Sequence, residues 1–228
     1  MPRIRPATAL PPPEPSDSVR IRILRAATTV FGRLGYGATS VEAILEEASV
    51  SRRTFYKAFR SKEDVLRVLF DNSVAMLLGA VREAERSGKS ARERLHASVE
   101  GYIRVHARAG PLARVLLLEQ FTPSSPLARQ RDAAMQAFTR LITETLVREG
   151  RPAPDPILVH GVVAAINQIA VQMATEYPQG GWDIERAKKA MLRILRALDD
   201  RPENASDGAA FAGGAKTSKH GGASEQEE

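Results

Sequence analysis

Basic side chains are concentrated in one short stretch of this 228-residue chain. The stretch from Ser51 to Lys62 contains no acidic residue and five basic ones: Arg52, Arg53, Lys57, Arg60 and Lys62. Phosphate oxygens attract guanidinium and ammonium groups that are presented together on a short helix. An Arg near the start of such a helix can also donate two hydrogen bonds to the O6 and N7 atoms of guanine. The stretch therefore predicts an element that contacts DNA.

Two short helices must position these side chains. Helical spacing of apolar residues predicts one helix over 40–47 and a second over 51–58, joined by a tight turn. Phe55 and Phe59 should fill a small core beneath the second helix, leaving the basic residues outside. In a helix-turn-helix the second helix enters the major groove while the first crosses the backbone. A charge run is usually only a solvated surface, but the agreement of turn, core spacing and basic face favours DNA binding.

The rest of the chain predicts helices only. Capping boxes such as Thr39 with Glu42, prolines at helix starts and glycines at helix ends delimit about nine helices. Their expected ranges are 17–34, 40–47, 51–58, 62–86, 91–108, 111–121, 126–149, 156–176 and 183–198. No segment alternates like a strand, so the expected fold is all-α. We expect a disordered proline-rich arm (1–16), a helix-turn-helix domain (17–72), a larger helical domain (73–200) and a disordered tail (201–228).

Composition argues against several classes of function. The chain has no cysteine, and its four histidines lack the spacing of metal ligands. No nucleophile–base constellation or phosphate-binding glycine loop is present, so no catalytic residue, metal or cofactor is expected. No apolar run approaches the roughly 20 residues that span a bilayer, and no signal peptide is recognisable. A cytoplasmic location and, from the net charge of +6, a polyanionic partner are expected.

Residues 17–72 resemble the N-terminal domain of the TetR family of transcriptional regulators. The resemblance is carried by Ala26, Phe31, Gly35, Thr39, Ile44, Ala48, Val50, Ser51, Thr54, Phe55, Tyr56, Phe59, Lys62 and Leu66. It implies DNA contacts from Thr39, Arg52, Arg53, Thr54, Tyr56, Lys57 and Lys62, to which we add the helix-start residues Ser40 and Ser51. The chain departs from the family at Ser49, where glycine is usual, and at Leu45, where alanine is usual. In a left-handed conformation Ser49 would cost about 1 kcal/mol.

The resemblance also implies a homodimer formed by the last two long helices. Apolar stripes support this with Leu158, Val162, Ala165, Ile166, Ile169, Met191, Ile194, Leu195 and Leu198. The alternative is that both stripes pack within one subunit. A two-fold dimer would read a palindrome-like site.

A ligand pocket in the C-terminal helices is a further expectation from the resemblance. Its candidate residues are Tyr102, His106, Gln120, Phe121, Phe138 and Asn167, with Gln168 and Gln172 as further polar candidates. Tyr102 and His106 are more commonly core residues. Few charges lie on these faces, which favours an apolar or weakly polar effector.

The expected function is a homodimeric repressor that a small-molecule effector releases from double-stranded DNA. An activator or an effector-independent regulator is the alternative within the same class. An all-α enzyme, or a basic bundle that binds membrane or RNA without specificity, are alternatives from other classes. The operator sequence and the regulated genes do not follow from the sequence.

Overall fold

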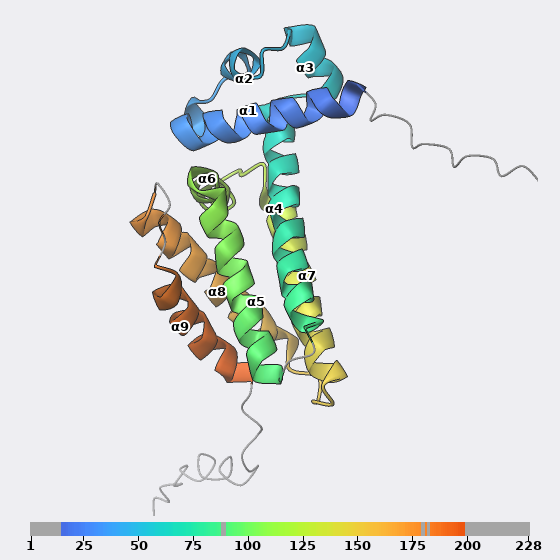
Figure 1. Cartoon of the computed structure of the whole chain (residues 1–228), viewed down its shortest axis with the longest axis vertical. Helices are drawn as coiled ribbons and strands as arrows, with labels where there is room; N and C mark the ends of the chain where they lie inside the picture. Colours follow the sequence, from blue (N-terminus) through green and yellow to red (C-terminus); the bar gives the residue numbers. More distant parts are fainter. Residues whose placement is uncertain (1–14, 88–89, 179–180, 182, 199–228) are drawn as a thin grey trace, which may run out of the picture. The chain divides into compact units, whose positions relative to one another are not determined.

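The computed structural model describes residues 15–87, 90–178, 181 and 183–198. Within these residues the chain forms nine α-helices, one 3₁₀ helix and no strand (Figure 1), so the all-α prediction is confirmed. The helices are α1 (Pro15–Ala38), α2 (Val41–Ala48), α3 (Arg52–Ala58), α4 (Lys62–Glu85), α5 (Ala91–Ala109), α6 (Pro111–Glu119), α7 (Ala128–Arg148), α8 (Pro156–Glu176), α9 (Ile184–Leu195) and η1 (Arg196–Leu198). The predicted tail, and the predicted arm up to residue 14, lie outside the described residues.

Most helix boundaries follow the predicted capping residues. Gly35 leaves the helical conformation at φ 78°, which ends the regular part of α1 near the predicted residue. The predicted start of α7 at Pro126 is wrong, because α7 begins at Ala128. The Ser125 hydroxyl accepts a hydrogen bond of 3.0 Å from the Leu127 N–H, so this serine stabilises a turn before the helix.

The buried side chains form two clusters, and two helices contribute to both. The first cluster joins α1, α2 and α3 to the start of α4, for example through Phe31, Phe55 and Leu66. The second lies among α5, α8 and α9, with Leu77 from farther along α4. From α6, Leu112, Val115 and Leu116 belong to the first cluster, whereas Ala113 and Leu117 belong to the second. The division near residue 72 stays a prediction, since α4 and α6 continue through both clusters.

Helix α8 corrects one sequence expectation. Its 21 residues are apolar enough to cross a membrane by length and composition, so the expectation that no run approaches that length is wrong. However, α8 packs against α6, α7 and α9, and Val159, Val162 and Met173 on it are buried. A core helix of a soluble protein has the same composition, which makes the helix weak evidence for a membrane span.

Candidate functional site

The turn between α2 and α3 sets the direction of the basic helix. Ser49 is left-handed, at φ 50° and ψ 49°. Its N–H donates to the Glu46 carbonyl, and the Val50 N–H donates to the Leu45 carbonyl, each over 3.1 Å. Serine therefore occupies a conformation that glycine adopts about 1 kcal/mol more easily. The hydrogen bonds close α2 and turn the chain into α3.

Helix α3 is held at both ends. The Ser51 hydroxyl accepts a hydrogen bond of 3.1 Å from the Thr54 N–H and caps its start. Phe55 and Phe59 are 0% and 2% exposed, in agreement with their spacing. At the other end, Arg20 from α1 donates to the Ala58 carbonyl over 2.8 Å, and its guanidinium lies 4.3 Å from the centre of the Phe59 ring. These contacts fix which side of α3 faces solvent.

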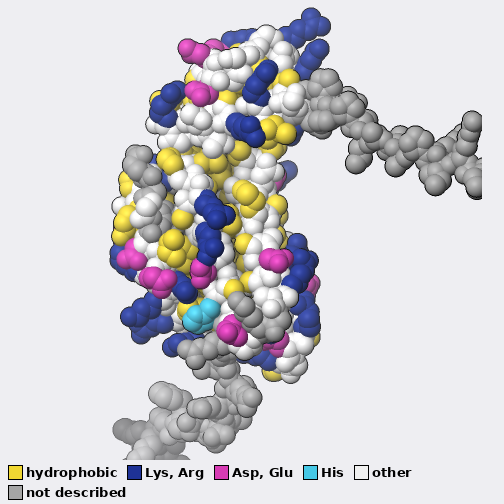
Figure 2. All heavy atoms as spheres, viewed as in Figure 1, with side chains coloured by type: hydrophobic (Ala, Val, Ile, Leu, Met, Phe, Trp, Pro, Cys, Tyr) yellow, Lys and Arg dark blue, Asp and Glu magenta, His cyan; other side chains and the backbone are white. Residues whose placement is uncertain are grey.

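The outer face of α3 carries exposed side chains of Arg52, Arg53, Tyr56 and Lys57. Arg52 forms an ion pair with Glu42 of α2. Among the described residues, neither Arg53 nor Lys57 has an ion-pair partner. Figure 2 shows Lys and Arg side chains protruding at the end of the molecule that α1, α2 and α3 form in Figure 1. Arg53 and Lys57 can therefore bind an external anion without first breaking an ion pair.

Two of the expected DNA contacts, Thr39 and Lys62, have partners inside the protein. Thr39 is 2% exposed and its hydroxyl donates to the Gly35 carbonyl over 2.7 Å. The Lys62 ammonium donates to the carbonyls of Tyr36 and Thr39, over 3.1 and 2.7 Å. The predicted capping box at Thr39 is also wrong, because the exposed Ser40 caps α2 and accepts from the Ala43 N–H. In this conformation Thr39 and Lys62 position the helices, whereas Ser40 remains at the surface.

Three of the expected pocket residues form an aromatic cluster between α5 and α7, in which Tyr102 and His106 are buried and Phe138 is partly buried. The Tyr102 ring lies 4.6 Å from that of His106 and 6.0 Å from that of Phe138, centre to centre. Burial lowers the pKa of His106 to about 4, although a hydrogen bond with the Tyr102 carbonyl acts in the opposite direction. Burial also raises the pKa of Tyr102. Both side chains are therefore neutral near pH 7.

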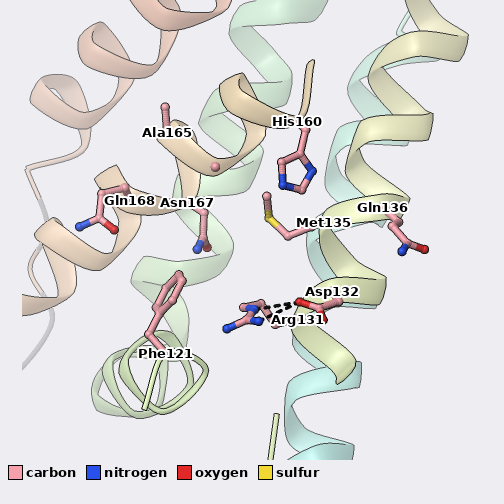
Figure 3. A pocket seen from close by; sticks show the side chains of 10 residues that line it. Phe121, Arg131, Asp132, Met135, Gln136, His160, Ala165, Asn167 and Gln168 are labelled. Carbon is pink, nitrogen blue, oxygen red and sulfur yellow. Dashed lines mark hydrogen bonds and ion pairs between the residues drawn. The ribbon is translucent and has the colours of Figure 1, made fainter. Parts of the chain in front are cut away.

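A surface groove of about 700 Å³ lies between α7 and α8, beside the residues that follow α6 (Figure 3). Its apolar lining is Phe121, Met135, Ala164 and Ala165, and its polar lining is Arg131, Asp132, Gln136, His160, Asn167 and Gln168. Three expected pocket residues, Phe121, Asn167 and Gln168, line it. Gln120 is buried next to it and donates to the Leu117 carbonyl over 3.1 Å. The sequence pattern indicates neither Arg131 nor His160, because helical spacing does not reveal that α7 and α8 form a groove.

The expected dimer residues divide into buried and accessible sets. Val162, Met191, Leu195 and Leu198 are at most 8% exposed within one subunit, so they cannot form an outer face in this conformation. In this structure these four side chains pack within one subunit. Leu158 is 43% exposed, and the neighbouring Ile157 is 83% exposed. The remaining candidates, Ala165, Ile166, Ile169 and Ile194, are partly buried.

Comparison with known proteins identifies relatives of the segment that carries α3. The model of the family "Bacterial regulatory proteins, tetR family" matches residues 23–69, which include the turn and the basic face described above. The chain is 28% identical over 135 residues to the HTH-type transcriptional activator FasR of Mycolicibacterium smegmatis. It is 25% identical over 130 residues to the fatty acid metabolism regulator protein of Bacillus subtilis. These alignments cover 59% and 57% of this chain, and 62% and 66% of the two relatives, so the chain spans less than two thirds of each.

Solved structures are similar over more of the chain. Thermus thermophilus FadR, a TetR family transcriptional repressor in complex with lauroyl-CoA, is 28% identical with a TM-score of 0.58. That likeness covers 80% of this chain and 96% of FadR. FadR from Bacillus halodurans, described as a fatty acid degradation regulator, has a TM-score of 0.67 at 20% identity, over 86% of this chain and all of that one. At this identity the second likeness shows the fold alone.

Proposed function

Because this chain belongs to the TetR family of transcriptional regulators, we propose that it is a homodimeric repressor released from a palindrome-like operator by a small-molecule effector. The observation that carries the proposal is the outer face of α3, where Arg53 and Lys57 are exposed, without ion-pair partners among the described residues, above a fixed aromatic core. In this proposal Arg53, near the start of α3, contacts base edges in the major groove. Lys57 and Tyr56 contact phosphates and fix the register of the protein on the duplex.

Exposed apolar side chains at the start of α8 support the dimer. Ile157 and Leu158 are large, exposed and adjacent, which is a surface that association would bury. In the proposed dimer the accessible faces of α8 and α9 pair with their copies, and the two α3 helices enter successive major grooves about 34–36 Å apart. The proposal places the protein in the cytoplasm with its DNA.

The relatives indicate the class of effector. The Bacillus subtilis relative is a regulator of fatty acid metabolism, and Thermus thermophilus FadR is bound to lauroyl-CoA. The groove between α7 and α8 combines apolar and polar side chains, as a ligand with an alkyl chain and a polar head requires. The proposed effector is therefore a fatty acyl compound. Its alkyl chain fits the sequence expectation of an apolar molecule, whereas its polar head group departs from that expectation.

Activation is the second candidate function, and a specific observation favours it. FasR is named a transcriptional activator. Both candidates require specific DNA binding and differ only in what the bound protein does at the promoter. Transcription from the bound promoter in vitro, with and without the protein, separates them.

Fluorescence anisotropy tests the shared part of the proposal. The purified chain is titrated into the intergenic DNA upstream of its own gene and into a scrambled duplex, at about 0.15 M salt. We expect a preference of about a thousandfold or more for one site. Arg53→Ala should lose about 1–3 kcal/mol of that preference, whereas Arg140→Ala, at an exposed position on α7, should keep it. Unchanged discrimination by the Arg53 variant would refute its role in reading bases.

A further inference from the structure

Among the described residues that line the groove between α7 and α8, Arg131 is the cationic side chain. Most of its neighbours in the groove are apolar or neutral polar side chains. In Figure 3 the Arg131 and Asn167 side chains point into the space between the two helices, with the Phe121 ring at one end. The acidic side chain in the same lining is Asp132. Phe121 and Met135 provide apolar surface in the same groove, whose volume is about 700 Å³. An alkyl chain and an anionic head group would therefore both find complementary surface there.

Arg131 also holds the end of α6. It donates a hydrogen bond of 3.0 Å to the carbonyl of Gln120, the residue that caps α6, and lies 5.8 Å from the centre of the Phe121 ring. It pairs with Asp132 over 2.9 Å as well, and this carboxylate is 62% exposed. A guanidinium has five N–H donors, so Arg131 can exchange partners when another anion enters the groove.

Helix α6 leads from this arginine to the DNA-binding helices. Its apolar residues are shared between the two buried clusters. At its start, Pro111 lies so close to α1 that a Cβ added to Gly32 would be 3.2 Å from the Pro111 side chain. Since α1 supports α3 through Arg20, a displacement of α6 would be transmitted to the basic face.

We propose that Arg131 binds the anionic head group of an amphipathic ligand in this groove, exchanging the Gln120 carbonyl for that anion and thereby releasing the end of α6. This inference rests on the proposed function and assigns the site through which the effector acts. The required chemistry is an alkyl chain with a phosphate or carboxylate. Because Asp132 pairs with the same guanidinium, its negative charge opposes binding of the ligand anion, although this carboxylate is largely exposed to solvent.

Three amphiphiles with the same alkyl chain test the inference: lauroyl-CoA, dodecanoate and 1-dodecanol. Isothermal titration measures their affinity for the full-length protein, and anisotropy measures the release of operator DNA. Wild type should bind an anionic probe more tightly than 1-dodecanol and release DNA on binding it. A preference for lauroyl-CoA over dodecanoate identifies phosphates as the source of the anion, and the reverse order identifies the carboxylate. If no anionic probe binds wild type, the inference and the acyl effector both fail, although DNA binding through Arg53 stands.

Two variants that should change the affinity for the anionic probe in opposite directions distinguish recognition of the anion from structural support of the groove. Arg131→Gln should lower affinity for the anionic probe about tenfold or more, leave 1-dodecanol binding unchanged and abolish release of DNA. Asp132→Asn should raise affinity for the anion several-fold, because it removes the competing charge. Arg129→Gln, at an exposed position on the same helix that does not line the groove, is the matched control.

The inference is overturned if Arg131→Gln binds and responds to the anionic probe like wild type, which leaves the proposed repressor intact. It is also overturned if affinity for the anion and for 1-dodecanol falls equally, since Arg131 would then only support the groove. Should Arg131→Gln not fold, unchanged anion affinity in Asp132→Asn would overturn the inference instead.

Discussion

The Lys62 ammonium lies 2.7 Å from the Thr39 carbonyl oxygen and donates a hydrogen bond to it, joining the start of α4 to the chain two residues before α2. The same ammonium donates to the Tyr36 carbonyl and lies 4.6 Å from the centre of the Tyr36 ring. Tyr36 in turn donates from its hydroxyl to Glu63 over 3.0 Å. One lysine thus satisfies carbonyls left open where the chain leaves α1, and it fixes α2 relative to α4.

Replacing Lys62 with Met should mainly lower the free energy of unfolding. Its effect on the electrostatic attraction to DNA should be smaller. Loss of hydrogen bonds from a charged donor to partly buried carbonyls should cost about 1–3 kcal/mol of unfolding free energy. Urea denaturation of Lys62→Met and wild type measures that difference.

The salt dependence of operator binding tests whether Lys62 instead contacts a DNA phosphate. If Lys62 does not contact phosphate, the slope of log affinity against log salt should match that of wild type. A slope smaller by about one would mean that Lys62 contacts a phosphate in the complex, as the family resemblance implies, and that it changes partners on DNA binding.

Substituting Ser49 with Gly should stabilise the protein. The left-handed conformation at φ 50° is strained for serine and freely available to glycine. We expect a gain of up to about 1 kcal/mol, reduced by the greater entropy of glycine in the unfolded chain. Ser124 is also left-handed, at φ 59°, so Ser124→Gly is a matched control away from α3. Operator affinity should be unchanged in both variants. A change of operator affinity in Ser49→Gly alone would mean that the conformation of this turn affects how α3 contacts DNA.

Much of the fold could be predicted because its signals are local. Gly35 ends the regular part of α1, Ser90 and Glu93 form a capping box, and Pro156 begins α8, and each acts on the few residues around it. The start of α7 could not be predicted in this way, because Ser125 and Pro126 have the same local pattern as a helix start. There the serine hydroxyl stabilises a turn instead.

The candidate site could be predicted only as far as one helix determines it. The exposed face of α3 follows from the positions of Phe55 and Phe59 alone. By contrast, the apolar stripe containing Met191 does not reveal whether it faces its own bundle or a partner, and in the structure it faces the bundle. The partners of Lys62 and the pairing of Arg131 with the end of α6 join separate helices, so no spacing in the sequence predicts them.

Replacing Glu42 with Gln should strengthen binding to DNA. Glu42 pairs with Arg52 at the edge of the basic face, and both side chains are 61% exposed. A pair so exposed contributes about 0–1 kcal/mol to stability, so unfolding should change little. The variant removes a negative charge near the proposed phosphate contacts and frees Arg52, so affinity for scrambled DNA should rise several-fold. Glu144→Gln, on α7, is the control, and equal effects of the two variants would place the cause in net charge alone.

His106 should make stability fall in mildly acidic solution. Burial lowers its pKa in the folded protein to about 4 from an ordinary 6.5, so between these values the unfolded chain binds more protons. Its contribution is fully present above about pH 6.5 and is lost as the pH falls towards 4, by at most about 3 kcal/mol. Tyr102, which packs against it, stays neutral throughout this range, because burial raises its pKa.

The measurement is urea unfolding across this pH window for wild type, His106→Leu and His160→Ala. His106→Leu should flatten the dependence, whatever its stability at neutral pH, because leucine does not titrate. His160→Ala, at an exposed position outside this aromatic cluster, is the control. If His106→Leu kept the wild-type slope, the acid sensitivity would arise from other groups, and the buried imidazole would be charged in the folded protein.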